Sequence, residues 1–268
     1  MAALAGIFVY PIKSLDATTR ERASIVTNGA LDGDREYAMV DDDGEYVNGK
    51  RTRTVHRIRA DYDDDRDHVT LRVHGEQTRG RRFHLDDDRD AIEAWLDDRF
   101  DPSVELRREP EGGYPDDETL SGPTVVSTAT LETVASWFPE MTVTGARRRF
   151  RANLEIGGVE PFWEERLYAD HGRCVAFRIG DVTFRGVNPC QRCVVPSRDP
   201  DTGEETADFR ETFLQRREAT LPEWADSDRF DHYYRLMVNT QVPRTEWGET
   251  LTVGDDVTIL EERALEQE

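Results

Sequence analysis

The 268-residue sequence predicts an α+β fold that is mainly β, with a β-barrel or mixed architecture rather than a doubly wound sheet. Many short segments carry β-branched or aromatic residues, and Asn-Gly or Asp-Gly turns separate those near the N-terminus. Few segments show helical spacing. No glycine-rich nucleotide loop follows a strand, so Rossmann and P-loop folds are excluded.

We expect strands at residues 5–10, 23–27, 36–40, 69–73, 81–85, 124–126, 149–156, 174–179, 182–184, 233–238 and 257–260. Helices are expected at residues 90–100, from about 127 to 138, and at 208–217, with Ser127 as the N-cap of the second. Residues 109–123 are rich in Pro, Gly and acid, which indicates a linker or a long loop.

The charge composition narrows the function classes. Lysine and arginine total 35 and aspartate and glutamate total 56, so the formal net charge is −21. Only Lys13 and Lys50 are lysines, and this Asp-rich, Arg-retaining composition resembles that of proteins from salt-accumulating, halophilic cells. The net charge argues against nucleic acid and anionic membranes as partners, because phosphate groups would be repelled.

Localisation is predicted to be cytoplasmic. The apolar run at residues 2–10 is interrupted by Gly6 and is too short to span a bilayer, and it has neither a basic leader nor a clear cleavage site. The three cysteines are too few for a disulfide framework and suit a reducing compartment.

The segment from Cys190 to Gly203 reads CQRCVVPSRDPDTG and carries the most chemical information. Zinc is disfavoured because the remaining Cys and His residues do not complete four ligands. A thioredoxin-like dithiol is disfavoured because no helix starts at the pair. A single thiolate bound to a soft metal remains, with Arg192 expected to favour the thiolate of Cys193. From the residues alone, this metal-binding hypothesis is as well supported as the alternative that both cysteines are small buried side chains. The residues also do not show which of the two cysteines would be the ligand. Residues 199–203 favour a β-turn over a calcium loop.

Taken together, the motifs of the chain resemble the MOSC superfamily, and most closely its branch with an N-terminal MOSC β-barrel, which includes the mitochondrial amidoxime-reducing component. The motifs that carry the resemblance are YPIKS from Tyr10, DREYAMV from Asp34, RANL from Arg151, WEE from Trp163, CQRC from Cys190, DPDTG from Asp199, FDHY from Phe230 and TVGD from Thr252. The resemblance implies a MOSC N-terminal β-barrel domain at residues 1–118 and a MOSC domain with flanking helices at residues 119–262.

The resemblance also implies the site. Cys193 matches the molybdenum ligand and is the expected catalytic residue. The positions that match those holding the anionic pterin and its phosphate are Lys13, Ser14, Arg35, Arg151, Asn153 and Arg192. Three further positions match cofactor contacts, namely Ser121, Gln191 and Tyr233. Each has an alternative: Ser121 as an ordinary loop serine, Gln191 as a contact through its backbone only, and Tyr233 as a core tyrosine.

The function implied is that of an oxidoreductase with a molybdenum cofactor (Mo-molybdopterin) that reduces small N-hydroxylated or N-oxygenated compounds. Electrons would come from a separate donor, namely a ferredoxin, a flavoprotein or a cytochrome. Three cysteines cannot ligate an iron–sulfur cluster, and the chain has no flavin or nicotinamide motif. The alternative is a carrier of the cofactor or a sulfur-transfer module with a persulfide on Cys193. A cofactor-free interaction protein is a third hypothesis, and no general acid or base is predicted.

Overall fold

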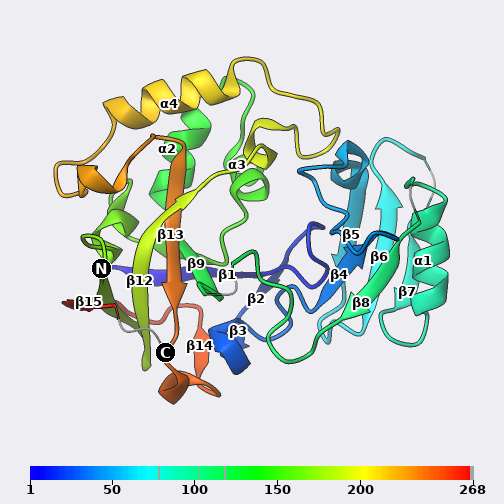
Figure 1. Ribbon diagram of the computed structural model, residues 1–268, viewed down its shortest axis with the longest axis horizontal. Helices are drawn as coiled ribbons and strands as arrows, with labels where there is room; N and C mark the ends of the chain where they lie inside the picture. The colour runs from blue at the N-terminus through cyan, green and yellow to red at the C-terminus, as the bar shows by residue number, and fades with distance from the viewer. Residues whose placement is uncertain (78, 102, 118, 266–268) are drawn as a thin grey trace.

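The structure is a computed structural model that describes residues 1–77, 79–101, 103–117 and 119–265. Within these ranges it contains fifteen strands, four α-helices and six short 3-10 helices (Figure 1). The predicted α+β, mainly β class is therefore confirmed. None of the helices in the described part of the chain has the length and apolar character that crossing a bilayer requires.

The larger part of the molecule is a β-barrel. Its eight-stranded sheet has the order β15 (Val257–Ala264), β11 (Arg173–Ile179), β12 (Val182–Gln191), β13 (Arg235–Gln241), β9 (Gly122–Ser127), β10 (Leu154–Gly157), β1 (Ala3–Val9) and β2 (Thr18–Arg20). An isolated bridge joins Ala3 to Asp256, and the backbone N–H of Leu4 donates to the carbonyl of Asp255 at 2.8 Å. These contacts close the sheet between β1 and β15, so the first strand of the chain completes the barrel.

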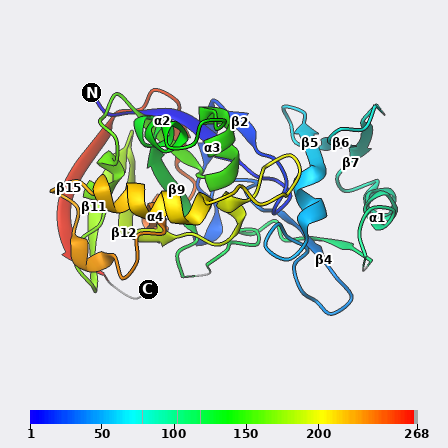
Figure 2. The same cartoon turned by 90° about the horizontal axis from the view of Figure 1, so that it is seen from above.

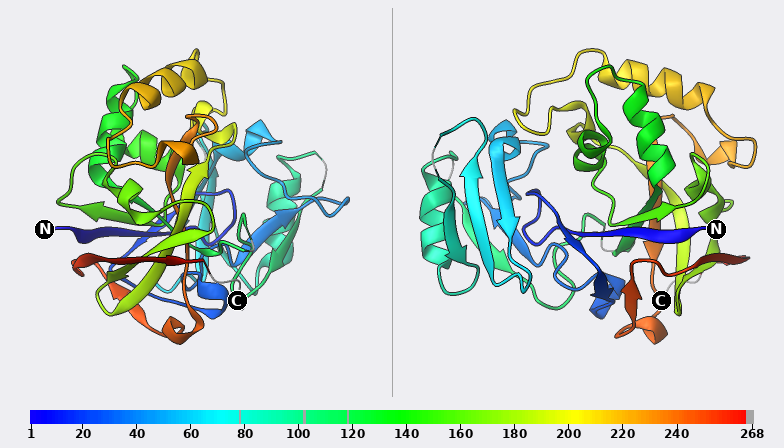
Figure 3. Two further views of the ribbon diagram at one scale, coloured as in Figure 1. Left: turned by 60° about the vertical axis from the view of Figure 1, so that its left-hand side comes forward. Right: turned by 180° about the vertical axis from the view of Figure 1, so that it is seen from behind.

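Three helices, α2 (Thr128–Ser136), α3 (Val143–Phe150) and α4 (Phe209–Ala219), lie together over one side of the barrel (Figures 1 and 3). Ser127 caps α2, as expected, because its side chain accepts a hydrogen bond from the backbone of Thr130. The predicted strand at 149–156 is wrong in its first half. Thr142 caps α3, the helix continues to Phe150, and β10 begins only at Leu154.

The other end of the molecule holds two small sheets and one helix (Figure 2). One sheet pairs β4 (Tyr37–Val40) with β8 (Glu105–Arg108), and the other has the order β5 (Ile58–Tyr62), β6 (His68–Val73), β7 (Arg81–His84). Helix α1 (Arg89–Asp97) packs Ile92 and Leu96 into the core that these sheets share with Val69 and Phe83. The helix expected at 90–100 is thereby confirmed, with an earlier end.

A short strand from the N-terminal part of the chain pairs with one from the C-terminal part. Strand β3 (Arg22–Ser24) pairs with β14 (Thr250–Thr252), so the strand predicted at 23–27 is shorter than expected. Residues 109–117 and 119–121 contain no helix or strand, in keeping with the predicted long loop. The predicted domain boundary falls at residue 118, which lies outside the described residues. Division of the chain at that point stays a prediction.

Candidate anion-binding and thiol site

One cavity of about 360 Å³ lies where the barrel meets the smaller lobe, and both halves of the chain line it. The predicted site residues that line it are Lys13, Ser14, Arg35, Ser121, Arg151, Asn153, Arg192 and Cys193. Gln191 and Tyr233 are not among its lining residues. Gln191 is exposed at the end of β12, and Tyr233 stacks on Phe230 with ring centroids 6.0 Å apart. The fold therefore brings eight of the ten predicted residues to one cavity, although they come from positions between residue 13 and residue 193.

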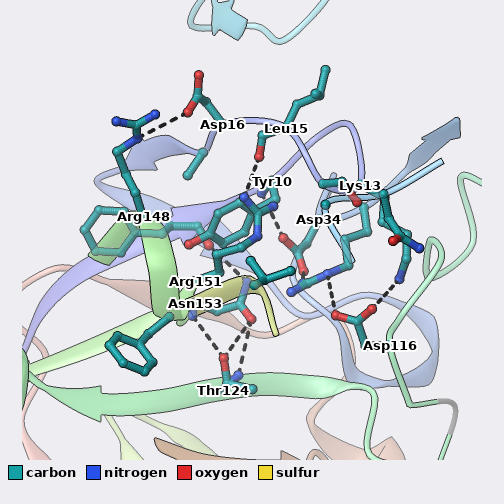
Figure 4. Close-up of a pocket in the computed structure, with 18 of the residues that line it drawn as sticks. Tyr10, Lys13, Leu15, Asp16, Asp34, Asp116, Thr124, Arg148, Arg151 and Asn153 are labelled. Atoms are coloured by element: carbon teal, nitrogen blue, oxygen red, sulfur yellow. Dashed lines mark hydrogen bonds and ion pairs between the residues drawn. The ribbon is translucent and has the colours of Figure 1, made fainter. Parts of the chain in front are cut away.

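Lys13 and Arg35 form a basic cluster beyond the end of β1, and Figure 4 shows Lys13 beside Asp116. The Nζ of Lys13 donates to the backbone carbonyl of Tyr114 and to Oδ1 of Asp116, both at 2.8 Å. Arg35 pairs with Asp34, and its Nε lies 3.9 Å from Oδ2 of Asp116. Burial lowers the pKa of Lys13 from its ordinary value. Desolvation alone would raise the pKa of Asp116, but Arg35 and Lys13 outweigh it and hold that pKa well below its usual range.

Asp116 is therefore an anionic group that already lies against the basic cluster. Its side chain is 62 % exposed, whereas that of Lys13 is 8 % exposed. A carboxylate so open to solvent can move away, and the buried lysine cannot. If Asp116 moved away, Lys13 and Arg35 would be left without this partner at the cavity wall.

Arg151 differs from its neighbours because no carboxylate of the described residues forms a salt bridge with it. Its Nη1 donates to the carbonyl of Leu15 at 2.7 Å, and its guanidinium lies 4.1 Å from the ring centroid of Tyr10 (Figure 4). Burial lowers the pKa of Arg151. The same burial raises the pKa of Tyr10 to about 12, so its ring stays neutral beneath the cation. A partly buried guanidinium without an anionic partner is a ready binding group for an anion.

Asn153 serves the framework of this wall. Its Oδ1 accepts from the backbone N and the Oγ1 of Thr124, both at 3.3 Å, and its Nδ2 donates to the carbonyl of Phe8 at 3.1 Å. Ser121 is likewise engaged, because its Oγ donates to the carbonyl of Asn28. Both side chains line the cavity while they hold neighbouring segments in place.

The thiol end of the cavity is built by the loop that follows β12. Cys190 and Cys193 are free and partly buried. The guanidinium of Arg192 turns to Cys190, with Nη1 at 3.1 Å from its Sγ, and its Nη2 donates to the carbonyl of Phe150 at 3.0 Å. Among the described residues no hydrogen bond joins Arg192 to Cys193, so the expectation that the charge of Arg192 favours the Cys193 thiolate stays a prediction. The Nε of Arg192 is buried without a hydrogen-bond partner there.

A metal at Cys193 would need ligands from outside the protein. Within the described residues, no group of three or more His, Cys, Asp or Glu side chains could hold a metal ion. Residues 199–203 form the turn that the sequence favours, because Asp199 Oδ1 accepts from the backbone N–H groups of Asp201 and Thr202, each at 3.0 Å.

The backbone is strained around the same cavity. Ser14, Arg35, Arg151 and Met237 have φ angles of 78°, 54°, 58° and 65°, in the left-handed region that non-glycine residues rarely adopt. All four line the cavity. Such conformations cost about 1–3 kcal/mol each and tend to gather at functional sites.

Sequence reasoning missed several lining residues, among them Lys50, His56, Arg59, Arg148 and Asn239. Lys50, His56 and Arg59 come from the smaller lobe. None of the motifs that carried the family resemblance lies between residues 40 and 151, so these three residues were not predicted. One signal was present for Lys50, because it is one of only two lysines in the chain and the other is Lys13.

A thiol, a guanidinium without a carboxylate partner and a basic cluster lie in one cavity, and these are the groups that suit a soft metal and an anion. Residues 1–101 match the family described as the MOSC N-terminal beta barrel domain, and residues 122–258 match the MOSC domain. The chain belongs to the MOSC family.

Curated relatives agree with this membership. Mitochondrial amidoxime-reducing component 1 of Homo sapiens is 23 % identical over 308 residues, covering 96 % of this chain and 82 % of the human protein. The same component of Mus musculus is 25 % identical over 307 residues, with the same coverage. Molybdenum cofactor sulfurase of Drosophila mojavensis is 24 % identical over 94 % of this chain, but the match spans only 34 % of the sulfurase.

Two solved structures are distantly similar. The YUAD protein from Bacillus subtilis has a TM-score of 0.39 and 11 % identity, covering 97 % of this chain and 96 % of that one. YiiM from Geobacillus stearothermophilus has a TM-score of 0.33 and 10 % identity over 52 % of this chain and 54 % of that one. At these TM-scores neither likeness supports a conclusion about the cavity.

Proposed function

We propose that this MOSC protein binds a molybdenum–pterin cofactor through Cys193 and reduces N-hydroxylated or N-oxygenated compounds with electrons from a separate donor protein. The observation that carries the proposal is the shared cavity of Cys193 and Arg151. A thiolate suits a soft transition metal, and a guanidinium without a carboxylate partner suits a phosphate group. Relatives named amidoxime-reducing components support the reaction class.

The residues present fit such a cofactor. Lys13, Arg35 and Arg151 would hold its phosphate, with Lys13 as a point charge and the arginines as planar forks. The cavity volume, about 360 Å³, falls within the range of small-molecule sites.

When bound, the cofactor would supply the two-electron oxygen-atom transfer. The chain would supply position and charge. The ring of Tyr10 and the carbonyl of Leu15 fix the direction of the Arg151 guanidinium. The hydrogen bonds of Asn153 to Thr124 and Phe8 hold β9 and β1 at a constant separation beneath it. This basic wall would hold the anionic end of the cofactor in place relative to Cys193, which lines the same cavity.

The test is metal analysis of protein made in a host that produces the cofactor, comparing wild type with Cys193→Ser and with the matched variant Cys190→Ser. We expect Cys193→Ser to lose molybdenum roughly tenfold or more, because the one ligand that the protein is proposed to give the metal is gone, and Cys190→Ser to keep most of it. Wild type should then reduce benzamidoxime with a chemical reductant. Equal molybdenum in Cys193→Ser and wild type would contradict the assignment of the ligand.

A carrier or sulfur-transfer module is the second candidate, and the match to molybdenum cofactor sulfurase over 94 % of this chain favours it. It would hold the same cofactor, or a persulfide on Cys193, for delivery to another enzyme. Wild-type protein with full molybdenum and no turnover of benzamidoxime would favour this function over the reductase.

A further inference from the structure

The smaller lobe contributes a rigid turn, residues 48–50, to the cavity wall. The Oδ1 of Asn48 accepts from the backbone N–H of Lys50 at 2.9 Å. Arg198, which follows Cys193 along the chain, donates from Nη1 to the carbonyl of Gly49 at 2.6 Å and from Nη2 to that of Lys50 at 3.2 Å. His56 Nε2 lies 3.2 Å from the same Gly49 carbonyl. The turn is thereby fastened to the segment that carries the thiol.

Lys50 is the charged residue that this turn presents. It lines the cavity and is exposed, and its ammonium makes no hydrogen bond or ion pair with the part of the chain that the structure describes. Lys13, by contrast, is buried and is engaged by Asp116 and Tyr114. Both lysines of the chain therefore face one cavity, although arginine supplies the other 33 of the 35 basic residues.

Lys50 differs from the cations assigned to the cofactor in its exposure and in its contacts. Lys13, Arg35 and Arg151 are buried or partly buried and each makes a hydrogen bond or ion pair, whereas Lys50 is exposed and its ammonium makes neither with the described residues. A chain with a net charge of −21 repels anions over most of its surface. An unpaired ammonium at the cavity gives an anionic substrate a local favourable contact. Its flexible stem can follow substrates of different size.

We propose that Lys50 binds a carboxylate or similar oxyanion on the substrate, so that the preferred substrates are N-oxygenated compounds that also carry an anionic group. The inference rests on the proposed reductase function, and it names the substrate class that this site prefers. The adjacent Arg51 provides a matched control. It belongs to the same basic turn but pairs with Glu45 at 3.1 Å and does not line the cavity.

The test compares two amidoximes that differ in one group, benzamidoxime and para-carboxybenzamidoxime, with the molybdenum-loaded protein at low ionic strength. We expect wild type to favour the carboxylate by roughly three- to tenfold in kcat/KM, as a partly exposed charge contact allows. Lys50→Met should bring the ratio close to unity, while Lys50→Arg and Arg51→Met should retain it. A wild-type ratio near unity, or an unchanged ratio in Lys50→Met, overturns the proposal.

Two further measurements separate this inference from the proposed function. Calorimetric titration with benzoate and benzamide, which are not reduced, should show tighter benzoate binding to wild type and no preference in Lys50→Met. Without turnover of either amidoxime the reductase proposal fails, and the benzoate titration still decides the role of Lys50. Loss of molybdenum in Lys50→Met would assign Lys50 to the cofactor and overturn the inference.

Discussion

Two arginines of the α3 region differ in whether they have a carboxylate partner. This difference distinguishes a cation that stabilises the fold from one that is free to bind a ligand. Arg147 is paired with Glu155, whose side chain is 4 % exposed, and its Nη2 donates to Oε2 at 3.0 Å. Arg151 faces the cavity with a carbonyl and an aromatic ring as its contacts. Removing the first would leave a buried carboxylate without its partner, whereas removing the second would relieve an unpaired cation.

We predict that Arg151→Met lowers cofactor content roughly tenfold or more, because a charge-assisted contact is lost. Its free energy of unfolding in the cofactor-free state should change by less than about 1 kcal/mol. Arg147→Met should instead destabilise that state by roughly 3 kcal/mol, since Glu155 is left buried and unpaired. Pterin analysis and urea unfolding provide the measurements. Equal destabilisation by the two substitutions would contradict the distinction.

At the scale of elements, the turn at residues 199–203 joins parts of both lobes. Asp201 Oδ1 lies 2.6 Å from Nη1 of Arg59 in β5 and 2.9 Å from Nη1 of Arg148 in α3. Desolvation alone would raise the pKa of Asp201, but Arg148 and Arg59 outweigh it and lower that pKa. The ionised carboxylate therefore stabilises the junction beside the cavity.

We predict that Asp201→Asn destabilises the protein by about 1 kcal/mol near neutral pH, a modest value because the carboxylate is partly exposed. Since the folded pKa lies below the unfolded value of about 3.8, the contribution is present above that pH and is lost as the pH falls through the folded pKa. Urea unfolding of both proteins across this range measures the difference. A difference that grows on acidification would exclude the proposed ion pairs as its source.

At the scale of the whole molecule, the net charge of −21 opposes compaction. Raising potassium chloride from about 0.1 to about 2 M shortens the screening length to a few ångströms. We predict that the melting temperature of the cofactor-free protein rises over this range. Calorimetry in matched buffers gives the measurement. A melting temperature that falls steadily with salt would show that charge repulsion at the surface does not limit the thermal stability of the protein.

The sequence alone determined the class of fold and most of the strands. Alternating β-branched residues and glycine turns are local signals, and they located strands such as β6, β7 and β11 closely. Helix α3 was missed because it is short and its charged run, Arg147 to Arg149, obscures the apolar positions Val143, Ala146 and Phe150 that pack into the core. The barrel closure between β1 and β15 was equally out of reach, since residues so distant in sequence carry no local mark of their pairing.

For the site, it was the resemblance of the motifs to the MOSC superfamily that named Cys193, Lys13, Arg35 and Arg151, because residue types alone do not distinguish Cys193 from Cys190 or one arginine from another. Only the tertiary structure decided which of the named residues share a cavity, turned Arg192 toward Cys190, and brought Lys50 to the wall of the same cavity. The physical reason is that a motif fixes chemistry and local conformation, whereas the direction of a side chain depends on packing between segments far apart in the chain.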